Sequence, residues 1–271
     1  FNLFFVPLMS LLALFVAFGP QSRWKRSDSE ATVRRGRMPL AIAILSAAAL
    51  PWLYSSDYHW GAAVAVLLAA WVAAMTLEDL LLKVRLQQRR GVAWSAALGK
   101  LSGSYWGMVT AHLGIAVMVL GVGFTTSYDE QRDVRLAPGE SSTLMGYEFT
   151  LRTIEQVPGP NYNAWRGTID ITRQGRAVST LQPEKRTYLA GGQTMTEADI
   201  DAGLGRDLYV SLGEPLSGNA WAVRLHVKPL IRCIWLGALM MALGGVLAAI
   251  DKRYRRQKPI VATERTAEVT V

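Results

Sequence analysis

One histidine lies inside a long apolar segment of the sequence. His112 ends the stretch Trp106-Gly-Met-Val-Thr-Ala-His112 and is followed by Leu-Gly. An ionisable side chain within a membrane span is costly and commonly marks a functional site. A neutral imidazole in a dry site is also a good iron ligand. His112 is therefore the main candidate site residue, either as an iron ligand or as a histidine hydrogen-bonded to another helix, and spacing alone favours neither.

Glycines surround this histidine along the same segment. Gly107, Gly114 and Gly121 recur every seventh residue, which places them on one face of a helix. Small residues on a helix face allow a second backbone to approach closely. This face is expected to admit a neighbouring helix or a flat macrocycle.

The other candidate metal ligands are few. His59 stands beside Trp60 in a short polar link and is interpreted as an interfacial residue. His226 is expected on the polar face of a strand, solvated or facing headgroups. Both are expected near the outer membrane face, so neither should reach His112. Cys233 is the single cysteine, which excludes an internal disulfide, a CxxC redox pair and a CxxCH haem-attachment motif within this sequence.

The apolar residues are gathered into long runs. The sequence is 51% hydrophobic and only 18% charged. Runs of about 20 apolar residues cross the hydrocarbon core of a bilayer as helices. We therefore predict a membrane α-helical protein with about five transmembrane helices. Their expected ranges are 1–19, 38–54, 60–77, 105–126 and 229–250.

The basic residues predict an orientation. Lys and Arg cluster at 23–37, 83–100 and 252–258, whereas the link 55–59 carries none. By the positive-inside rule the clusters face the cytoplasm, so the link and the segment 127–228 face the periplasm of a bacterium. The net charge of +8 is explained by this topology, and we expect no nucleic-acid partner. No Asp or Glu falls in the middle of a span, which weakens a transporter or channel interpretation.

The segment 127–228 is polar and rich in turn residues. Alternating patterns predict strands at 147–156, 165–172, 207–212 and 221–227, and Thr196 with Asp199 suggests a short helix over 195–202. A small β-barrel or sandwich fits this segment. The predicted organisation is four transmembrane helices with cytoplasmic loops over 1–126, an inserted all-β periplasmic domain over 127–228, a fifth transmembrane helix over 229–250 and a basic cytoplasmic tail over 251–271.

Seven short stretches, spread in order over nearly the whole sequence, resemble one known family. The sequence resembles the C-terminal part of the cytochrome c maturation protein CcmF. The stretches are Phe1-Asn2…Phe5-Val-Pro-Leu-Met9, Trp106-Gly-Met-Val-Thr-Ala-His112-Leu-Gly114, Gly159-Pro-Asn-Tyr162, Pro183-Glu-Lys-Arg-Thr-Tyr188, Met195-Thr-Glu-Ala198, Arg206-Asp-Leu-Tyr-Val-Ser-Leu-Gly-Glu-Pro215 and Lys228-Pro229…Ile234-Trp235.

The resemblance implies a function. The family is the haem lyase of bacterial cytochrome c maturation in the inner membrane. It receives haem from the haem chaperone CcmE and helps attach it to the CxxCH motif of apocytochrome c, with CcmH/CcmI-type thiol-handling partners. It also carries a b-type haem, and His112 matches one of its transmembrane ligands. No catalytic residue is assigned within this sequence.

The resemblance also implies that functional parts lie elsewhere. The sequence opens inside an apolar run without an initiator Met, so we expect it to be the C-terminal part of a longer polypeptide. The second axial ligand of the haem b and the tryptophan-rich haem-binding segment are expected to precede Phe1. The alternative function is a non-enzymatic membrane scaffold whose periplasmic domain docks partner proteins.

Overall fold

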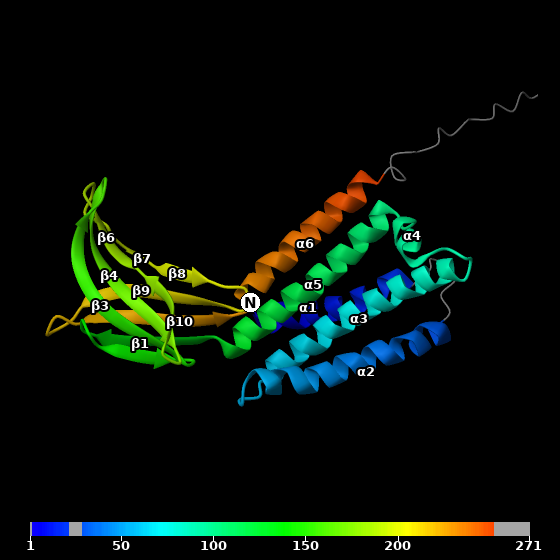
Figure 1. The fold of residues 1–271 in the computed structure, drawn as a ribbon, viewed down its shortest axis with the longest axis horizontal. Helices are drawn as coiled ribbons and strands as arrows, with labels where there is room; N and C mark the ends of the chain where they lie inside the picture. Colours follow the sequence, from blue (N-terminus) through cyan, green and yellow to red (C-terminus); the bar gives the residue numbers. More distant parts are fainter. Residues whose placement is uncertain (1, 22–28, 252–271) are drawn as a thin grey trace, which may run out of the picture.

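The protein consists of a bundle of long helices joined end to end with a β-domain (Figure 1). The computed structural model describes residues 2–21 and 29–251. The predicted tail over 251–271 lies almost wholly outside the described residues. The helices are α1 (Asn2–Val16), η1 (Gly19–Gln21), α2 (Ser29–Tyr54), α3 (Trp60–Gln88), α4 (Trp94–Gly99), α5 (Gly103–Tyr128) and α6 (Ile231–Ile250).

Four of the described helices are long and apolar enough to cross a membrane. They are α2, α3, α5 and α6, and α1 is a shorter apolar helix that contains Pro7. Together they account for the predicted set of about five. The α3 helix continues without a break past the apolar run to Gln88, so its charged end extends the span. Large apolar side chains remain exposed on α1, α2 and α6, as expected of helices solvated by lipid.

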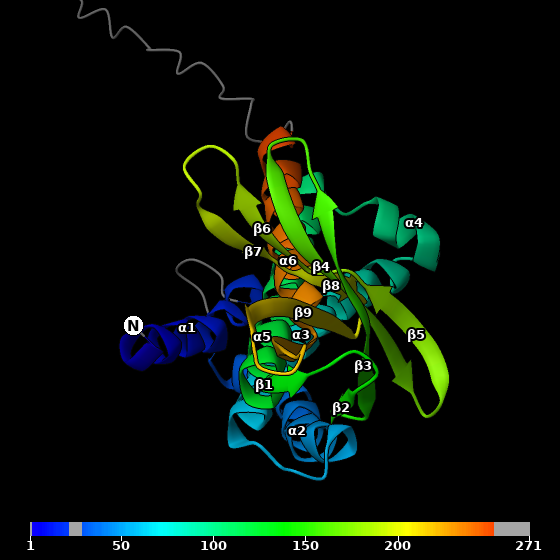
Figure 2. The same ribbon diagram turned by 90° about the vertical axis from the view of Figure 1, so that its left-hand side faces the viewer.

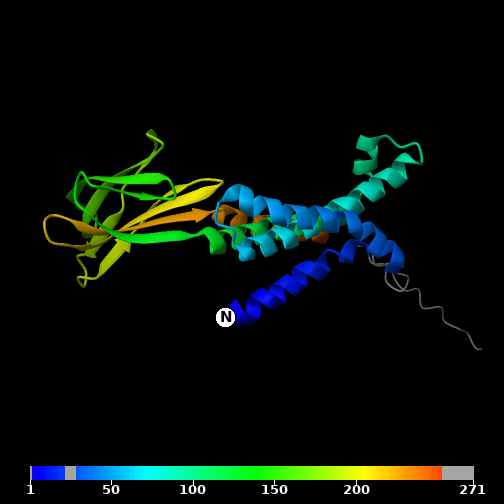
Figure 3. The same ribbon diagram turned by 90° about the horizontal axis from the view of Figure 1, so that it is seen from below.

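The α1 helix diverges from the bundle and approaches it only at its C-terminal end (Figure 3). The last four carbonyl groups of a helix have no partner within that helix. Two of these carbonyl groups, those of Leu14 and Val16, contact side chains of other helices. The indole Nε1 of Trp71 in α3 donates to the carbonyl oxygen of Leu14 at 3.1 Å, and the ring of Trp71 lies edge-on to Phe18. This contact fixes the end of α1 beside α3 and α5.

The β-domain contains ten strands, inserted between α5 and α6. They are β1 (Glu130–Leu136), β2 (Ser141–Leu144), β3 (Tyr147–Pro158), β4 (Tyr162–Arg173), β5 (Arg176–Leu181), β6 (Glu184–Tyr188), β7 (Thr194–Glu197), β8 (Asp199–Ala202), β9 (Arg206–Pro215) and β10 (Trp221–Pro229). The four strands predicted from alternation lie within β3, β4, β9 and β10, as expected.

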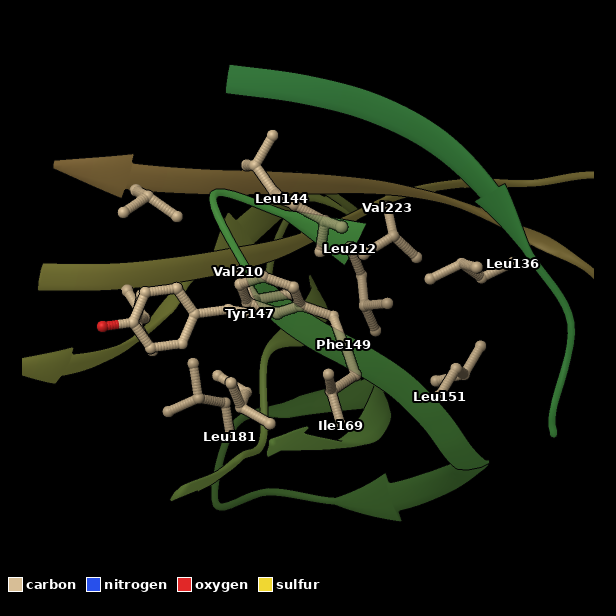
Figure 4. Packing of buried hydrophobic residues seen from close by; sticks show 14 of the residues in the cluster. Leu136, Leu144, Tyr147, Phe149, Leu151, Ile169, Leu181, Val210, Leu212 and Val223 are labelled. Atoms are coloured by element: carbon tan, nitrogen blue, oxygen red, sulfur yellow. The ribbon is translucent and has the colours of Figure 1, made fainter. Parts of the chain in front are cut away.

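Two antiparallel sheets build this domain (Figure 2). One has the order β1-β10-β9-β8, and the other has the order β2-β3-β4-β6-β7 with β5 also paired to β4. Apolar side chains from both sheets form one buried core, in which Phe149 and Ile169 meet Leu212 and Val223 (Figure 4). The alternation of Trp221, Val223, Leu225 and Val227 along β10 is the reason that this strand buries one face.

The predicted helix over 195–202 is wrong. This segment forms β7 and β8, which belong to different sheets. Thr196 does not cap a helix: its hydroxyl donates to the carbonyl oxygen of Leu212. The Asp199 carboxylate accepts from the backbone N–H of Gln182 at 2.6 Å. Strand pairing with β6 and β9 thus outweighs a capping pattern only a few residues long.

Candidate functional site

His112 lies in α5 where the C-terminal end of α1 reaches the bundle. Its Nδ1 is 2.8 Å from the carbonyl oxygen of Met108, one turn earlier in α5. Its Nε2 is 3.2 Å from the carbonyl oxygen of Val16, the last residue of α1. The ring is thus held between its own helix and an orphan carbonyl of another.

Two carbonyl oxygens surround a ring that has one N–H when neutral. A carbonyl can only accept a hydrogen bond, and a neutral imidazole donates from only one nitrogen. Charging the ring within an apolar helix bundle is costly. If Nδ1 donates to Met108, the lone pair of Nε2 faces the Val16 carbonyl. This nitrogen then has the chemistry of a metal ligand, with its tautomer fixed by the bond on the other nitrogen.

The described residues place the other candidate metal ligands away from His112. No group of three or more His, Cys, Asp or Glu side chains that could hold a metal ion occurs in the described part of the chain. His59 precedes α3 and stacks edge-on against Tyr128, which ends α5. Tyr128 lies on the order of 24 Å along the helix from His112. His59 therefore lies too far along the bundle to reach His112, as the sequence predicts.

The glycine face of α5 is filled by α6. A Cβ on Gly114 would lie 2.8 Å from the carbonyl oxygen of Gly237, and a Cβ on Gly237 would lie 2.5 Å from that of Gly114. The two backbones are therefore in direct contact. Of the two expected occupants of this face, the structure shows a neighbouring helix. His112 points the other way, toward α1.

A hollow of about 580 Å³ opens one turn closer to the start of α5. Met108 and Ala111 line it from α5, Gly244 lines it from α6 and Lys83 lines it from α3. Beside it the buried carboxylate of Asp79 accepts a 2.7 Å hydrogen bond from the Tyr105 hydroxyl. The ammonium group of Lys83 pairs with the same carboxylate. This end of the bundle is consequently polar and tightly bonded.

His226 is buried rather than solvated, which corrects the expectation from the sequence. Its side chain is 11% exposed, and Nε2 contacts the carboxylate of Asp129, the residue that follows α5. Strand alternation does place it opposite the apolar face of β10. However, Tyr209 of β9 is paired with it and covers the ring from the side. His226 therefore links the β-domain to the end of α5.

Two features of these sites could not be found by sequence reasoning. The Val16 carbonyl is a backbone group, and the type of a residue does not predict where the end of its helix will pack. The contact between Asp129 and His226 joins positions far apart in the sequence. By contrast, the pair Asp79 and Lys83 has the spacing of helical neighbours, which is a detectable signal.

Comparison with known proteins places these features in context. The family model described as the CcmF C-terminal β-sandwich matches residues 127–229. The cytochrome c-type biogenesis protein CcmF of Pseudomonas aeruginosa is 46% identical over 255 residues, covering 94% of this chain and 38% of the relative. CcmF of Escherichia coli is 41% identical over 275 residues, covering 100% of this chain and 40% of the relative. The chain thus spans well under half the length of these relatives.

A solved structure resembles the whole arrangement. The protein titled Cytochrome c Heme Lyase CcmF matches with a TM-score of 0.71 and 21% identity, covering 92% of this chain and 40% of that chain. At this identity the likeness supports the fold alone: apolar helices followed by an inserted β-sandwich and a last helix.

Proposed function

The chain belongs to the CcmF family of cytochrome c-type biogenesis proteins, and we propose that it is a membrane component of the cytochrome c maturation haem lyase. In this role it helps transfer haem from a haem chaperone to the CxxCH motif of apocytochrome c. The proposal is supported by the similarity over nearly the whole chain to relatives that carry this name. The same similarity supports haem attachment as its reaction class.

We assign to His112 the role of axial ligand to a haem b. The observation that carries this assignment is the position of the ring: Nδ1 lies 2.8 Å from the Met108 carbonyl oxygen of its own helix, and in the tautomer that donates to Met108 the lone pair of Nε2 points away from α5. When bound, a haem supplies an iron centre that changes between ferrous and ferric states. His112 would bind the iron, and Met108 would hold the ring in the ligating tautomer. The second axial ligand belongs to a part of the family's length that this chain does not span.

The β-sandwich is proposed to face the periplasm of the bacterial inner membrane, with the C-terminus in the cytoplasm. The alternation of basic and neutral connections supports this orientation. The proposed partners are the haem chaperone CcmE, CcmH/CcmI-type thiol-handling proteins and apocytochrome c. Docking is the role we assign to the β-domain, because its sequence is polar and rich in turn residues.

A second candidate function is a membrane scaffold in which His112 has only a structural role. The observation in its favour is that Nε2 lies 3.2 Å from the Val16 carbonyl, so the ring could simply join α1 to α5. In this case the helices anchor the β-sandwich, and no haem binds through His112.

The two functions are separated by absorption spectra of the purified protein, oxidised and reduced. The protein is expressed together with the part of the family's length that this chain does not span. The variants are His112→Gly and, as a matched control, His59→Ala. The haem-lyase proposal predicts a b-type Soret band that His112→Gly abolishes, that added imidazole restores and that His59→Ala leaves unchanged.

The opposite result would be informative as well. If His112→Gly keeps an unchanged spectrum and the circular dichroism of the wild type, His112 is not an iron ligand. The scaffold function would then account better for the ring between α1 and α5.

A further inference from the structure

Two arginines of the β-domain converge on one tyrosine. The hydroxyl oxygen of Tyr147 accepts from Nη1 of Arg173 at 3.1 Å and from Nε of Arg206 at 3.3 Å. Both guanidinium groups also lie over its ring, with centroid distances of 4.8 Å for Arg173 and 5.3 Å for Arg206. Arginine stacks on aromatic faces in this way, and the stacking fixes the planar fork in position.

This group lies at the end of the β-domain nearest the helices. Arg206 begins β9, where it pairs with Pro229, immediately before α6. The neighbouring residue Gly205 accepts a backbone hydrogen bond from Leu230. Figure 4 shows the Tyr147 hydroxyl pointing out of the apolar core, in the direction in which β10 runs toward α6. The two arginines thus lie at the end of the β-domain from which α6 begins.

The local charge is positive and incompletely balanced. Arg206 is paired with the carboxylate of Asp201 at 2.5 Å. Arg173 has no carboxylate partner within residues 2–21 and 29–251, and its cross-strand neighbour is another arginine, Arg176. Two like charges on neighbouring strands favour a nearby anion. The arrangement therefore fits an anion that accepts from two guanidinium groups.

We propose that Arg173 and Arg206, positioned by Tyr147, bind the phosphate of an anionic phospholipid headgroup. The planar fork of arginine matches the oxygens of a phosphate group and forms charge-assisted hydrogen bonds with them. The headgroup layer is the proposed source of phosphate, because Arg206 pairs with Pro229 just before the apolar helix α6, and Tyr54 at the end of α2 interacts electrostatically with Tyr147 and Arg173. The site orients the β-sandwich on the membrane and is independent of the haem ligand proposed above.

The test is the affinity of the detergent-purified protein for a short-chain phosphatidylglycerol, measured by native mass spectrometry. The double variant Arg173→Gln/Arg206→Gln is expected to bind at least tenfold more weakly than the wild type. The control is Arg152→Gln, which removes the same type of charge from an exposed position paired with Asp170 on the second sheet. The control should bind as the wild type does.

A second variant addresses the possibility that the double variant is misfolded. Tyr147→Phe keeps the ring under both guanidinium groups but removes the hydroxyl that holds them, so it should bind several-fold more weakly while retaining its fold by circular dichroism. Equal lipid affinity in wild type, double variant and Tyr147→Phe would overturn the proposal. So would inorganic phosphate displacing the lipid at equal concentration, because the site would then bind free phosphate rather than a headgroup.

Discussion

Gly107 of α5 and Gly244 of α6 touch through their backbones. A Cβ on Gly107 would lie 2.5 Å from the carbonyl oxygen of Gly244, and a Cβ on Gly244 would lie 2.5 Å from the carbonyl oxygen of Gly107. Such distances leave no room for a methyl group beside a rigid helix backbone. The same contact recurs seven residues further along at Gly114 and Gly237, so the two backbones stay close over about two helical turns.

The adjacent glycines of α6 offer a matched pair of variants for this contact. Gly244→Ala must push the two backbones apart, and overpacking of this kind costs about 1–3 kcal/mol of unfolding free energy. Gly245→Ala meets nothing within 4 Å and is expected to gain up to about 1 kcal/mol from helix propensity. Thermal unfolding in detergent should therefore show a lower Tm for Gly244→Ala and an equal or higher Tm for Gly245→Ala. Equal Tm values would refute the close contact.

The sequence predicts this contact only in part. The seven-residue spacing of Gly107, Gly114 and Gly121 places them on one face and indicates that something approaches closely. It does not say whether the neighbour is a helix or a macrocycle, because both need the same absence of side chains. The glycines Gly237 and Gly244 in α6 have the same seven-residue spacing. This spacing does not by itself show that the two glycine series contact each other.

The fold follows from the sequence wherever one pattern extends over many residues. Long apolar runs predict the helices, and alternation over six or more residues predicts β3, β4, β9 and β10. The segment over 195–202 is too short to express a period, so a local capping pattern competes with strand pairing that only the tertiary structure reveals. The predicted exposure of His226 is wrong for a similar reason. Alternation indicates the face of the strand on which it lies, but its burial depends on contacts such as that with Asp129 at the end of α5.

The contact between His226 and Asp129 predicts a coupling between the β-domain and α5. His226→Ala truncates a side chain that is only 11% exposed and removes the partner of the Asp129 carboxylate, which is itself 38% exposed, so the loss of this hydrogen bond is expected to cost about 0.5–1.5 kcal/mol. Hydrogen exchange should show faster opening at the end of α5 and the end of β10. Arg224→Ala, on the same strand but in an exposed pair with Asp133, is the control and should leave both regions protected. Equal exchange rates in the two variants would contradict the predicted coupling.

Glu184 predicts a dependence of stability on pH. Burial raises the pKa of this carboxyl, but hydrogen bonds from Arg186 and Arg166 outweigh burial, so the pKa is lowered overall. A lowered pKa in the folded state adds stability at pH values above the unfolded pKa, near 4.3, and this stability is lost as the pH falls through the folded value. Glu184→Gln should therefore lower the unfolding free energy by about 2 kcal/mol at pH 7.

The pH profile of the same variant provides the stricter measurement. The difference in Tm between wild type and Glu184→Gln should shrink as the pH falls below about 4.3, because the wild-type carboxyl becomes neutral there. Glu130→Gln, which changes an exposed carboxylate at the start of β1, is the control variant. A Tm difference that stays constant down to pH 3 would mean that the two arginines do not stabilise the ionised form of Glu184.

Asp79 predicts how strongly α3 and α5 are joined at the end of the bundle far from the β-domain. Its side chain is 6% exposed, and its carboxylate accepts from both Lys83 and the Tyr105 hydroxyl, while the Lys83 ammonium lies 4.0 Å from the centroid of the Tyr105 ring. The Lys83 side chain is 37% exposed, so water can still solvate its charge when Asp79 is removed, whereas the Tyr105 hydroxyl loses its acceptor at a cost of about 1–3 kcal/mol. Asp79→Leu should therefore lower the Tm most, because it leaves both Lys83 and Tyr105 without an acceptor.

The neighbouring substitutions make this expectation specific to the carboxylate. Asp79→Asn keeps an acceptor for Tyr105 and loses only the charge opposite Lys83, so its Tm should fall between those of the wild type and Asp79→Leu. Glu78→Gln alters the adjacent, less buried acid and should leave the Tm within one degree or so of the wild type, as surface changes of about 0.5 kcal/mol or less do. If Asp79→Asn and Asp79→Leu have the same Tm as Glu78→Gln, the hydrogen bonds of Asp79 do not hold α3 against α5. The contact of α5 with α6 must then fix this end of the bundle.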